Sequence, residues 1–465
     1  MQLKTSGVTA ESETDEHPPA KPAPQKTLLT LAGKMIIVQL APLIASLIVA
    51  RLIATAGGLE FSAYSLVNSI NLTVFIVISG ILQAIYVLGG DAIGKNDPAY
   101  YHHVISAGLK MAIVAAIVAT IFSALIGPVL KGLNYDVAFA RYSHFFALAS
   151  CLGIIPTILL VAFRIHASLN QRAGIASAIY MIGALFTIVV SLAFSSRFDS
   201  ALWITLFIIT VVAASQWLML VLALASLYVF PELRLSGQAS SKDVKRRTLS
   251  ILYAIGWPIG VVVFLDAFAP LFSSLFVGRL AIDAMPVHSV VSLWAVVVSI
   301  IPLGLSQSVV QHISVLNAQA QFAARNQIAL LAMLLTAGYG VVVYLVFLLW
   351  PVEIGQLLLG VSDEDSQRLL AELMPLGGIF LAFQSVIIMA AAILRGIGQT
   401  KAPMFQAIVG YLFIASGMQV LLGYVLKLGV QGIWWGMITG YVVTAIIISL
   451  RCMRELKPTR NTTNF

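Results

Sequence analysis

The stretch Gly256-Trp-Pro-Ile-Gly-Val-Val-Val-Phe-Leu-Asp266-Ala-Phe-Ala-Pro270 is apolar for a helical turn or more on either side of one carboxylate. It lies in a hydrophobic segment over about 249–277, which is long enough to cross a bilayer as a helix. Asp266 is the only one of the nineteen acidic residues deep inside such a segment. An ionisable side chain at that depth is costly and indicates an ion or substrate pathway. If the chain is a transporter, we expect Asp266 to bind the coupling ion.

The same apolar composition continues along the whole chain. Hydrophobic residues make up 60% of the 465 residues and charged residues 10%, whereas a soluble domain is usually about 25% charged. Because a span needs roughly 20 apolar residues, the sequence predicts an all-α polytopic membrane protein with about twelve transmembrane helices. The predicted spans are 29–54, 62–89, 104–130, 142–166, 173–195, 201–229, 249–277, 285–313, 327–350, 367–394, 403–426 and 430–450.

The positive charges are distributed unevenly between alternate loops. If the amino terminus is cytosolic, 20 of the 27 Lys and Arg residues fall on the cytosolic side and 7 on the other. This asymmetry follows the positive-inside rule and predicts that both termini lie in the cytosol. The membrane that the chain crosses is expected to be the cell inner (plasma) membrane. The net charge of +8 is therefore a topology signal, and we expect no nucleic-acid partner.

The two halves of the chain look related. Val49-Ala-Arg51-Leu ends the first span of one half, and Val277-Gly-Arg279-Leu ends the first span of the other. Two repeats of the same orientation imply six-helix lobes related by a pseudo-twofold axis along the membrane normal. The predicted organisation is a disordered cytosolic tail at 1–28, an N-terminal lobe at 29–230, a cytosolic connector at 231–248, a C-terminal lobe at 249–451 and a cytosolic tail at 452–465.

Several of these motifs resemble the multidrug and toxic compound extrusion (MATE) family. Leu394-Arg-Gly-Ile-Gly-Gln-Thr-Lys401-Ala-Pro-Met404 is similar to the family's loop before the eleventh helix. Gly256-Trp-Pro258-Ile-Gly, followed by Asp266, is similar to its seventh helix, and Gly429-Val-Gln-Gly-Ile-Trp434-Trp-Gly to the start of its last helix. The resemblance extends from about 30 to 451. It implies the family's fold, and we expect a monomeric exporter that works by alternating access.

The chain departs from the family pattern at acidic positions. Family members often carry an aspartate in the first helix, where this sequence has Pro42-Leu-Ile-Ala-Ser46-Leu with Ala45 near the expected position. Many bacterial members carry an acid in the tenth helix, where this sequence has Phe380-Leu-Ala-Phe383-Gln384-Ser385. The family's two-acid cation sites therefore do not carry over. Burial favours the neutral form of a lone carboxyl group, so we expect H⁺ as the coupling ion, Na⁺ as the less favoured alternative, and no other cofactor or metal.

Residues near Asp266 in the sequence complete the predicted site. Pro270 cannot donate to the Asp266 carbonyl, and Pro258 likewise frees the carbonyl of Ala254, so both prolines are predicted hinges. Aromatic side chains suit flat, apolar cations through stacking and cation–π contacts, although any single one is more often a packing residue. The predicted substrate contacts are Gln384, Trp257, Phe264, Trp294, Phe380 and Phe383.

Other polar and aromatic residues receive structural interpretations. We interpret Asn68 and Asn71 as contacts between helices. His288 is expected to be interfacial, and Trp434 and Trp435 are expected in the outer aromatic belt.

The sequence therefore predicts a secondary active antiporter that exports amphipathic, often cationic organic compounds or drugs and is driven by inward H⁺ movement. The alternative is a flippase of lipid-linked oligosaccharide or another lipid from the same superfamily. Such flippases tend to place several Arg or Lys residues in the central cavity, whereas here no basic residue is deep in a span. An intramembrane enzyme would need at least two cooperating groups at depth, and one aspartate is too few.

Overall fold

The computed structural model describes residues 24–234, 242–359 and 363–456, and all of its regular elements are helical. Most of the predicted tails and part of the connector lie outside these residues. Twelve helices in the described chain are long and apolar enough to cross a membrane, which confirms the predicted number of spans. The protein is therefore a multi-pass membrane protein.

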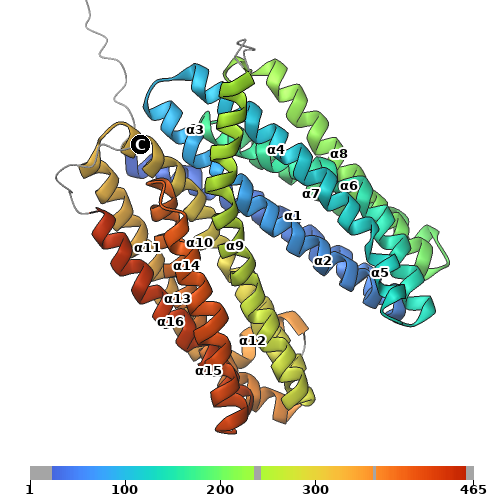
Figure 1. Ribbon diagram of the computed structural model, residues 1–465. Coiled ribbons are helices and arrows are strands. Elements are labelled where there is room, and N and C mark those ends of the chain that lie inside the picture. Colours follow the sequence, from blue (N-terminus) through green and yellow to red (C-terminus); the bar gives the residue numbers. More distant parts are fainter. Residues whose placement is uncertain (1–23, 235–241, 360–362, 457–465) are drawn as a thin grey trace, which may run out of the picture.

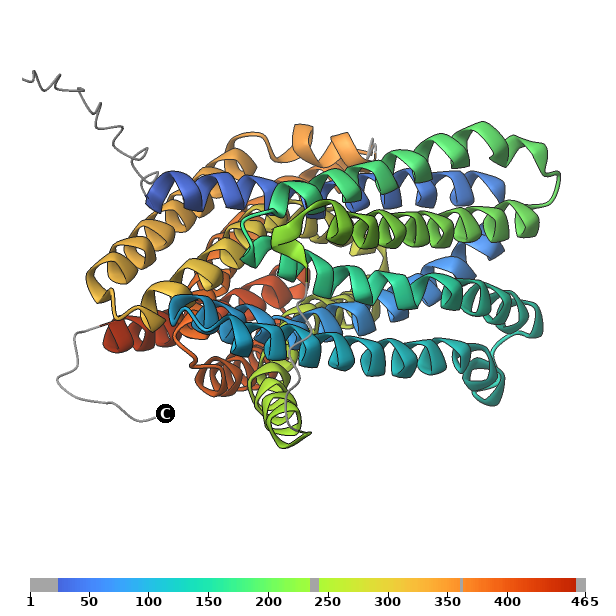
Figure 2. The same cartoon turned by 90° about the horizontal axis from the view of Figure 1, so that it is seen from above.

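The N-terminal lobe contains the first six spans. Its elements are α1 (Pro24–Ala56), α2 (Gly58–Leu82), α3 (Ala84–Gly94), α4 (Pro98–Ala124), α5 (Ile126–Gly132), α6 (Val137–Leu169), α7 (Ala173–Phe194), the 3₁₀ turn η1 (Ser195–Arg197) and α8 (Ala201–Val229). α2 and α3 together form one span over Gly58–Gly94, and α4 and α5 form another over Pro98–Gly132. In Figure 2, α1 and α4 lie on opposite sides of this lobe.

The C-terminal lobe contains the other six spans. Its elements are α9 (Lys242–Leu280), η3 (Ile282–Ala284), α10 (Met285–Ala318), α11 (Phe322–Leu349), α12 (Pro351–Leu359), α13 (Glu364–Gly396), α14 (Lys401–Ala407), the π-helical η4 (Ile408–Ala415), α15 (Ser416–Val420), the π-helical η5 (Leu421–Val425) and α16 (Gly429–Leu456). Pro258 and Pro270 both lie inside α9.

The two lobes form a V (Figure 1). They pack together at one end, where α1 and α3 contact α10 and α2 contacts α9, and they diverge toward α5 and α15. We call these the closed end and the open end. α1 begins and α16 ends on the side of the closed end, so the described chain enters and leaves the molecule there.

Small residues and neutral hydrogen bonds hold the closed end together. Gly94 of α3 lies so close to α10 that a Cβ there would stand 2.6 Å from the Val315 carbonyl oxygen. Helices in lipid associate through such close approaches between small residues. Ser168 donates to Gln311 Oε1 at 2.6 Å, and Gln311 Nε2 donates back to the Ser168 carbonyl at 2.8 Å. This reciprocal pair joins α6 of one lobe to α10 of the other.

The first connector residues are attached to the N-terminal lobe. They form the short 3₁₀ turn η2 (Pro231–Leu233). His166 Nε2 lies 3.0 Å from the Leu233 carbonyl oxygen, and Arg172 forms an ion pair with Glu232 at 2.7 Å. This end of the connector therefore belongs structurally to the lobe that precedes it.

Candidate functional site

Three helices of the C-terminal lobe converge on Asp266. The residue lies on α9 between the two prolines and is partly exposed. Gln384 of α13 places its Nε2 atom 3.2 Å from each carboxylate oxygen. Tyr441 of α16 donates its hydroxyl to Asp266 Oδ1 at 3.1 Å. The carboxylate is therefore held by two neutral donors from helices that are distant in sequence.

Further contacts orient both donors. The Ser299 hydroxyl of α10 lies 2.9 Å from Gln384 Oε1, which turns the amide nitrogen of Gln384 toward Asp266. Tyr441 is fully buried, stacks on Tyr411 at 4.4 Å and meets Phe380 edge-on at 4.6 Å. Both donors are thus fixed by packing and hydrogen bonds before any ion binds.

The Tyr441 hydroxyl also lies 3.5 Å from the backbone carbonyl oxygen of Asp266. Within a regular helix that carbonyl would accept from the amide four residues later, but residue 270 is proline and has no N–H. Tyr441 is therefore close to two acceptors of the same residue, the carboxylate and the carbonyl that Pro270 leaves free. A proton added to the carboxylate weakens the first acceptor and leaves the second unchanged.

This arrangement can exchange a proton or bind a small cation. The side chains recorded as hydrogen-bonding Asp266, those of Gln384 and Tyr441, carry no charge that would neutralise the carboxylate permanently. Within the described residues, no group of three His, Cys, Asp or Glu side chains is placed to hold a metal ion.

The aromatic residues predicted to contact substrate have different surroundings in the structure. Phe380 is 1% exposed and packs against Tyr441, whereas Phe383 is partly buried in the core. Trp294 donates its indole N–H to the Ile354 carbonyl of α12 at 2.9 Å. Trp257 and Phe264 lie on α9 and are 47% and 40% exposed. Of the predicted substrate contacts, Gln384 is the one that hydrogen-bonds to Asp266.

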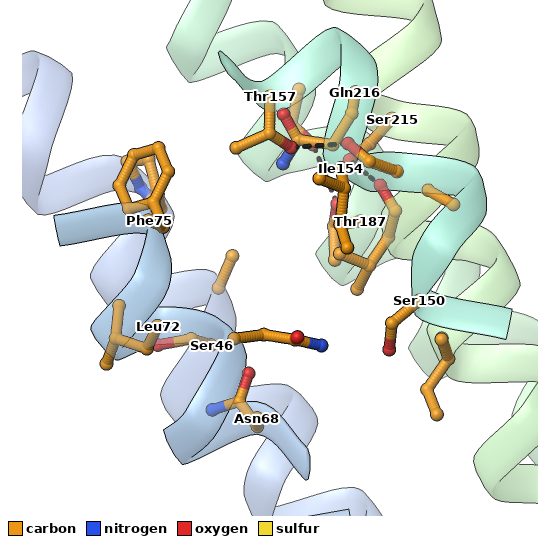
Figure 3. A pocket seen from close by; sticks show the side chains of 18 of the residues that line it. Ser46, Asn68, Leu72, Phe75, Ser150, Ile154, Thr157, Thr187, Ser215 and Gln216 are labelled. Carbon is orange, nitrogen blue, oxygen red and sulfur yellow. Dashed lines mark hydrogen bonds between the residues drawn. The ribbon is translucent and has the colours of Figure 1, made fainter. Parts of the chain in front are cut away.

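A cavity of about 300 Å³ lies in the other lobe, between α1, α2, α4, α6, α7 and α8. In Figure 3, Ser46, Asn68 and Phe75 on α1 and α2 face residues of α6, α7 and α8 across it. None of the described residues lining the cavity is Asp, Glu, Lys, Arg or His, and the predicted substrate contacts are not among them. The lining residues with polar side-chain atoms are Ser46, Tyr64, Asn68, Asn71, Ser150, Thr157, Tyr180, Thr187, Ser215 and Gln216.

The hydroxyl groups and the amides of this cavity differ in what they offer a ligand. Thr157 and Thr187 donate their hydroxyl protons to backbone carbonyls one turn earlier in their own helices, at 2.6 and 3.0 Å. Their oxygens can then act as acceptors toward a ligand. Asn68, Asn71 and Gln216 bring amides that both donate and accept. The cavity is therefore neutral and able to form several hydrogen bonds, and Asn68 and Asn71, interpreted from the sequence as contacts between helices, are among its lining residues.

Comparison with known proteins supports both the fold and its duplication. The family model described as MatE matches residues 31–193 and again residues 258–421, once in each lobe. The chain is 21% identical to "Probable multidrug resistance protein NorM" of Deinococcus radiodurans over 90% of its length and 93% of that protein's. It is 23% identical to "Multidrug resistance protein NorM" of Burkholderia vietnamiensis over 97% of both chains.

Solved structures share the architecture. The crystal structure of a mutant of the Vibrio cholerae MATE transporter VcmN matches with a TM-score of 0.85 and 13% identity, covering 94% of this chain and 98% of that one. The crystal structure of the eukaryotic MATE transporter AtDTX14 matches with a TM-score of 0.82 and 17% identity, covering 93% of this chain and 98% of that one. At these identities the likeness establishes the fold.

Proposed function

The chain belongs to the MatE family of membrane transporters, and from this premise we propose that it is a secondary active exporter of amphipathic organic compounds, driven by inward movement of H⁺ through Asp266. The observation that carries the proposal is the carboxylate between Gln384 and Tyr441, an acid within a membrane helix whose observed donors are neutral. An intramembrane acid held in this way is suited to repeated protonation and release. The curated relatives named as multidrug resistance proteins support the export of drug-like compounds.

The direction of transport follows from the proposed topology. The positive-inside asymmetry supports an orientation in which the closed end, where the described chain begins and ends, faces the cytosol. The conformation would then be one in which the lobes have separated toward the outside. Protonation of Asp266 from that side would shift the Tyr441 hydroxyl toward the free carbonyl of Asp266 and change the bend of α9 at Pro270.

The cavity of the N-terminal lobe supports the chemical class of the substrate. Its amides and hydroxyl oxygens suit a molecule with several polar groups, and Phe75, Tyr64 and Tyr180 offer faces for stacking. Its neutral lining can accept uncharged compounds as well as delocalised cations. We therefore propose that the substrate binds in one lobe while the proton binds in the other.

Purified protein in liposomes tests the proposal directly. Efflux of a fluorescent organic cation and of an uncharged fluorescent compound would be measured under an imposed pH gradient in Na⁺-free buffer, and again under an Na⁺ gradient without a pH difference. The pH gradient alone should drive export of both compounds. A strict requirement for Na⁺ would overturn the proton mechanism. Fluorescent lipid that changes leaflet in the same vesicles, without dye efflux, would favour the flippase instead.

A further inference from the structure

A second cluster of buried polar side chains lies between Asp266 and the open end of the C-terminal lobe. We call it the outer polar cluster, and it consists of Ser273 and Ser274 of α9, His288 of α10, Gln419 of α15 and Trp434 of α16. Four of the five are at most 1% exposed, and Ser274 is partly buried. His288 was expected at the interface and Trp434 in the aromatic belt, and both interpretations are wrong because both side chains are buried.

Hydrogen bonds and ring packing connect the members of the cluster. Ser273 Oγ lies 3.1 Å from Gln419 Oε1, and Ser274 Oγ lies 2.9 Å from His288 Nε2. The imidazole of His288 meets the indole of Trp434 edge-on at 5.5 Å. The two hydrogen-bonded pairs begin at consecutive residues of α9, and side chains of four helices contribute to the cluster.

Three polar atoms of the cluster are buried without a protein partner. They are His288 Nδ1, Gln419 Nε2 and Trp434 Nε1. Buried polar atoms in proteins are almost always hydrogen-bonded, and where the protein supplies no partner an ordered water usually does. Three such atoms, on helices that all pack against α9, indicate sites for bound water around that helix.

The outer polar cluster is aligned with Asp266. Ser273 follows Asp266 by seven residues, which places the two on the same face of α9 at a rise of about 10 Å. Ser273 Oγ also contacts Met437 Sδ at 3.3 Å, and Met437 lies one turn before Tyr441 on α16. The cluster and the acid therefore lie along one boundary between α9 and α16.

We propose that the outer polar cluster binds a short file of water and conducts protons from the open end to Asp266, with His288 as the relay residue. This inference rests on the proposed function. A hydronium ion on the outer side would give its extra proton to His288 Nδ1 and become water, and the imidazole would release its Nε2 proton to the Ser274 oxygen. The Ser274 hydroxyl, which donates to the Pro270 carbonyl oxygen at 3.0 Å in this conformation, would rotate and pass its own proton through water to the Asp266 carboxylate. Each relay group gains one proton and loses one, so only Asp266 changes its charge.

Proton uptake measured separately from substrate binding tests the relay. Vesicles containing the protein and an internal pH-sensitive dye would receive an external acid pulse in the presence of substrate. His288→Phe and Gln419→Leu should each slow substrate-dependent proton uptake by at least about tenfold. Substrate affinity at equilibrium should remain that of the wild type. His288→Gln, which can still hydrogen-bond to water, should recover part of the rate.

Two adjacent tryptophans supply a matched control. Trp434→Phe removes the buried indole N–H but keeps an aromatic ring, and it should slow proton uptake. Trp435→Phe makes the same change at a side chain that is 44% exposed and should have no effect. Equal slowing by both variants, or a slowed variant with reduced substrate affinity, would assign the cluster a structural role and overturn the relay.

The outcome also separates this inference from the proposed function. If the wild type exports substrate on a pH gradient while His288→Phe and Gln419→Leu take up protons at the wild-type rate, the relay is wrong. Protons would then reach Asp266 past its partly exposed side. If the wild type shows no proton-driven export, the proposed function itself fails.

Discussion

The two lobes share one fold and differ in chemistry. The same family model matches each of them, yet the N-terminal lobe has a neutral cavity and the C-terminal lobe has an intramembrane carboxylate with neutral donors. Ala45, near the position where the family resemblance implied an aspartate, lines the cavity of the first lobe. A duplicated scaffold can therefore keep its geometry while its two copies carry different chemistry, a neutral cavity in one and a carboxylate between neutral donors in the other.

Of the substitutions that test this difference between the lobes, removal of the Asp266 carboxylate should have the largest effect on transport. Asp266→Asn keeps the shape of the side chain but cannot ionise, so proton-driven efflux should fall to the level of empty vesicles. Asp266→Glu should keep partial activity, because it preserves the carboxyl group and moves it by one methylene. Substrate affinity in detergent should stay close to the wild-type value if the substrate binds in the N-terminal lobe.

The exposed residue Asp199 provides the matched control. Asp199→Asn makes the same chemical change outside both sites and should transport normally. Proton-driven efflux that survives Asp266→Asn would mean that the N-terminal lobe takes part in coupling, and the division between the lobes would be wrong.

A second acid should sharpen the comparison with a smaller effect. Gln384→Asp would place two carboxyl groups where one carboxylate now accepts from an amide. Like charges resist simultaneous ionisation, so the pair should retain a proton at a higher pH than Asp266 alone, and the two groups should titrate as a unit. The pH profile of efflux should therefore move upward. An unchanged profile would show that Gln384 does not share the site of the coupling proton.

A substitution in the N-terminal cavity should change substrate affinity and not the pH dependence of efflux. Gln216→Leu removes an amide from the lining and should weaken substrate binding by up to about tenfold, the effect of losing one good hydrogen bond. The pH profile should stay unchanged. Gln321→Leu, at an exposed position before α11, is the matched control. Calorimetry would measure the affinities, and a change in ion dependence without a change in affinity would contradict the assignment.

The smallest effect is expected at the closed end. Gln311→Leu removes the reciprocal pair with Ser168 and should shift the equilibrium between the two facing states by about fivefold, which corresponds to roughly 1 kcal/mol. Distances between spin labels on the two lobes would report the populations. His312→Leu, one position along α10, is a suitable comparison because its ring bonds to the Ser308 carbonyl within the same helix.

Hydropathy predicted the fold well and the site only in part. The bilayer imposes a minimum length on each helix, so the twelve spans were visible in the sequence. The rotation of each helix about its axis was not, since lipid and the protein core are both apolar. Tyr441 is 175 residues from Asp266 and looked like any tyrosine within a span. Trp434 looked like an interfacial aromatic for the same reason, although its side chain is buried.

The glycines of α3 have a practical consequence. Gly90 and Gly94 face α10 of the opposite lobe, and a Cβ at Gly94 would stand 2.6 Å from both the Val315 carbonyl oxygen and the Ala318 Cβ atom. One added methyl group would therefore act as a wedge in the closed end without touching the acid or the cavity. Alanine at either glycine should therefore enrich the conformer in which the lobes separate at the closed end. Such a variant would be useful for crystallisation or antibody selection, because the residues of both binding sites are unchanged.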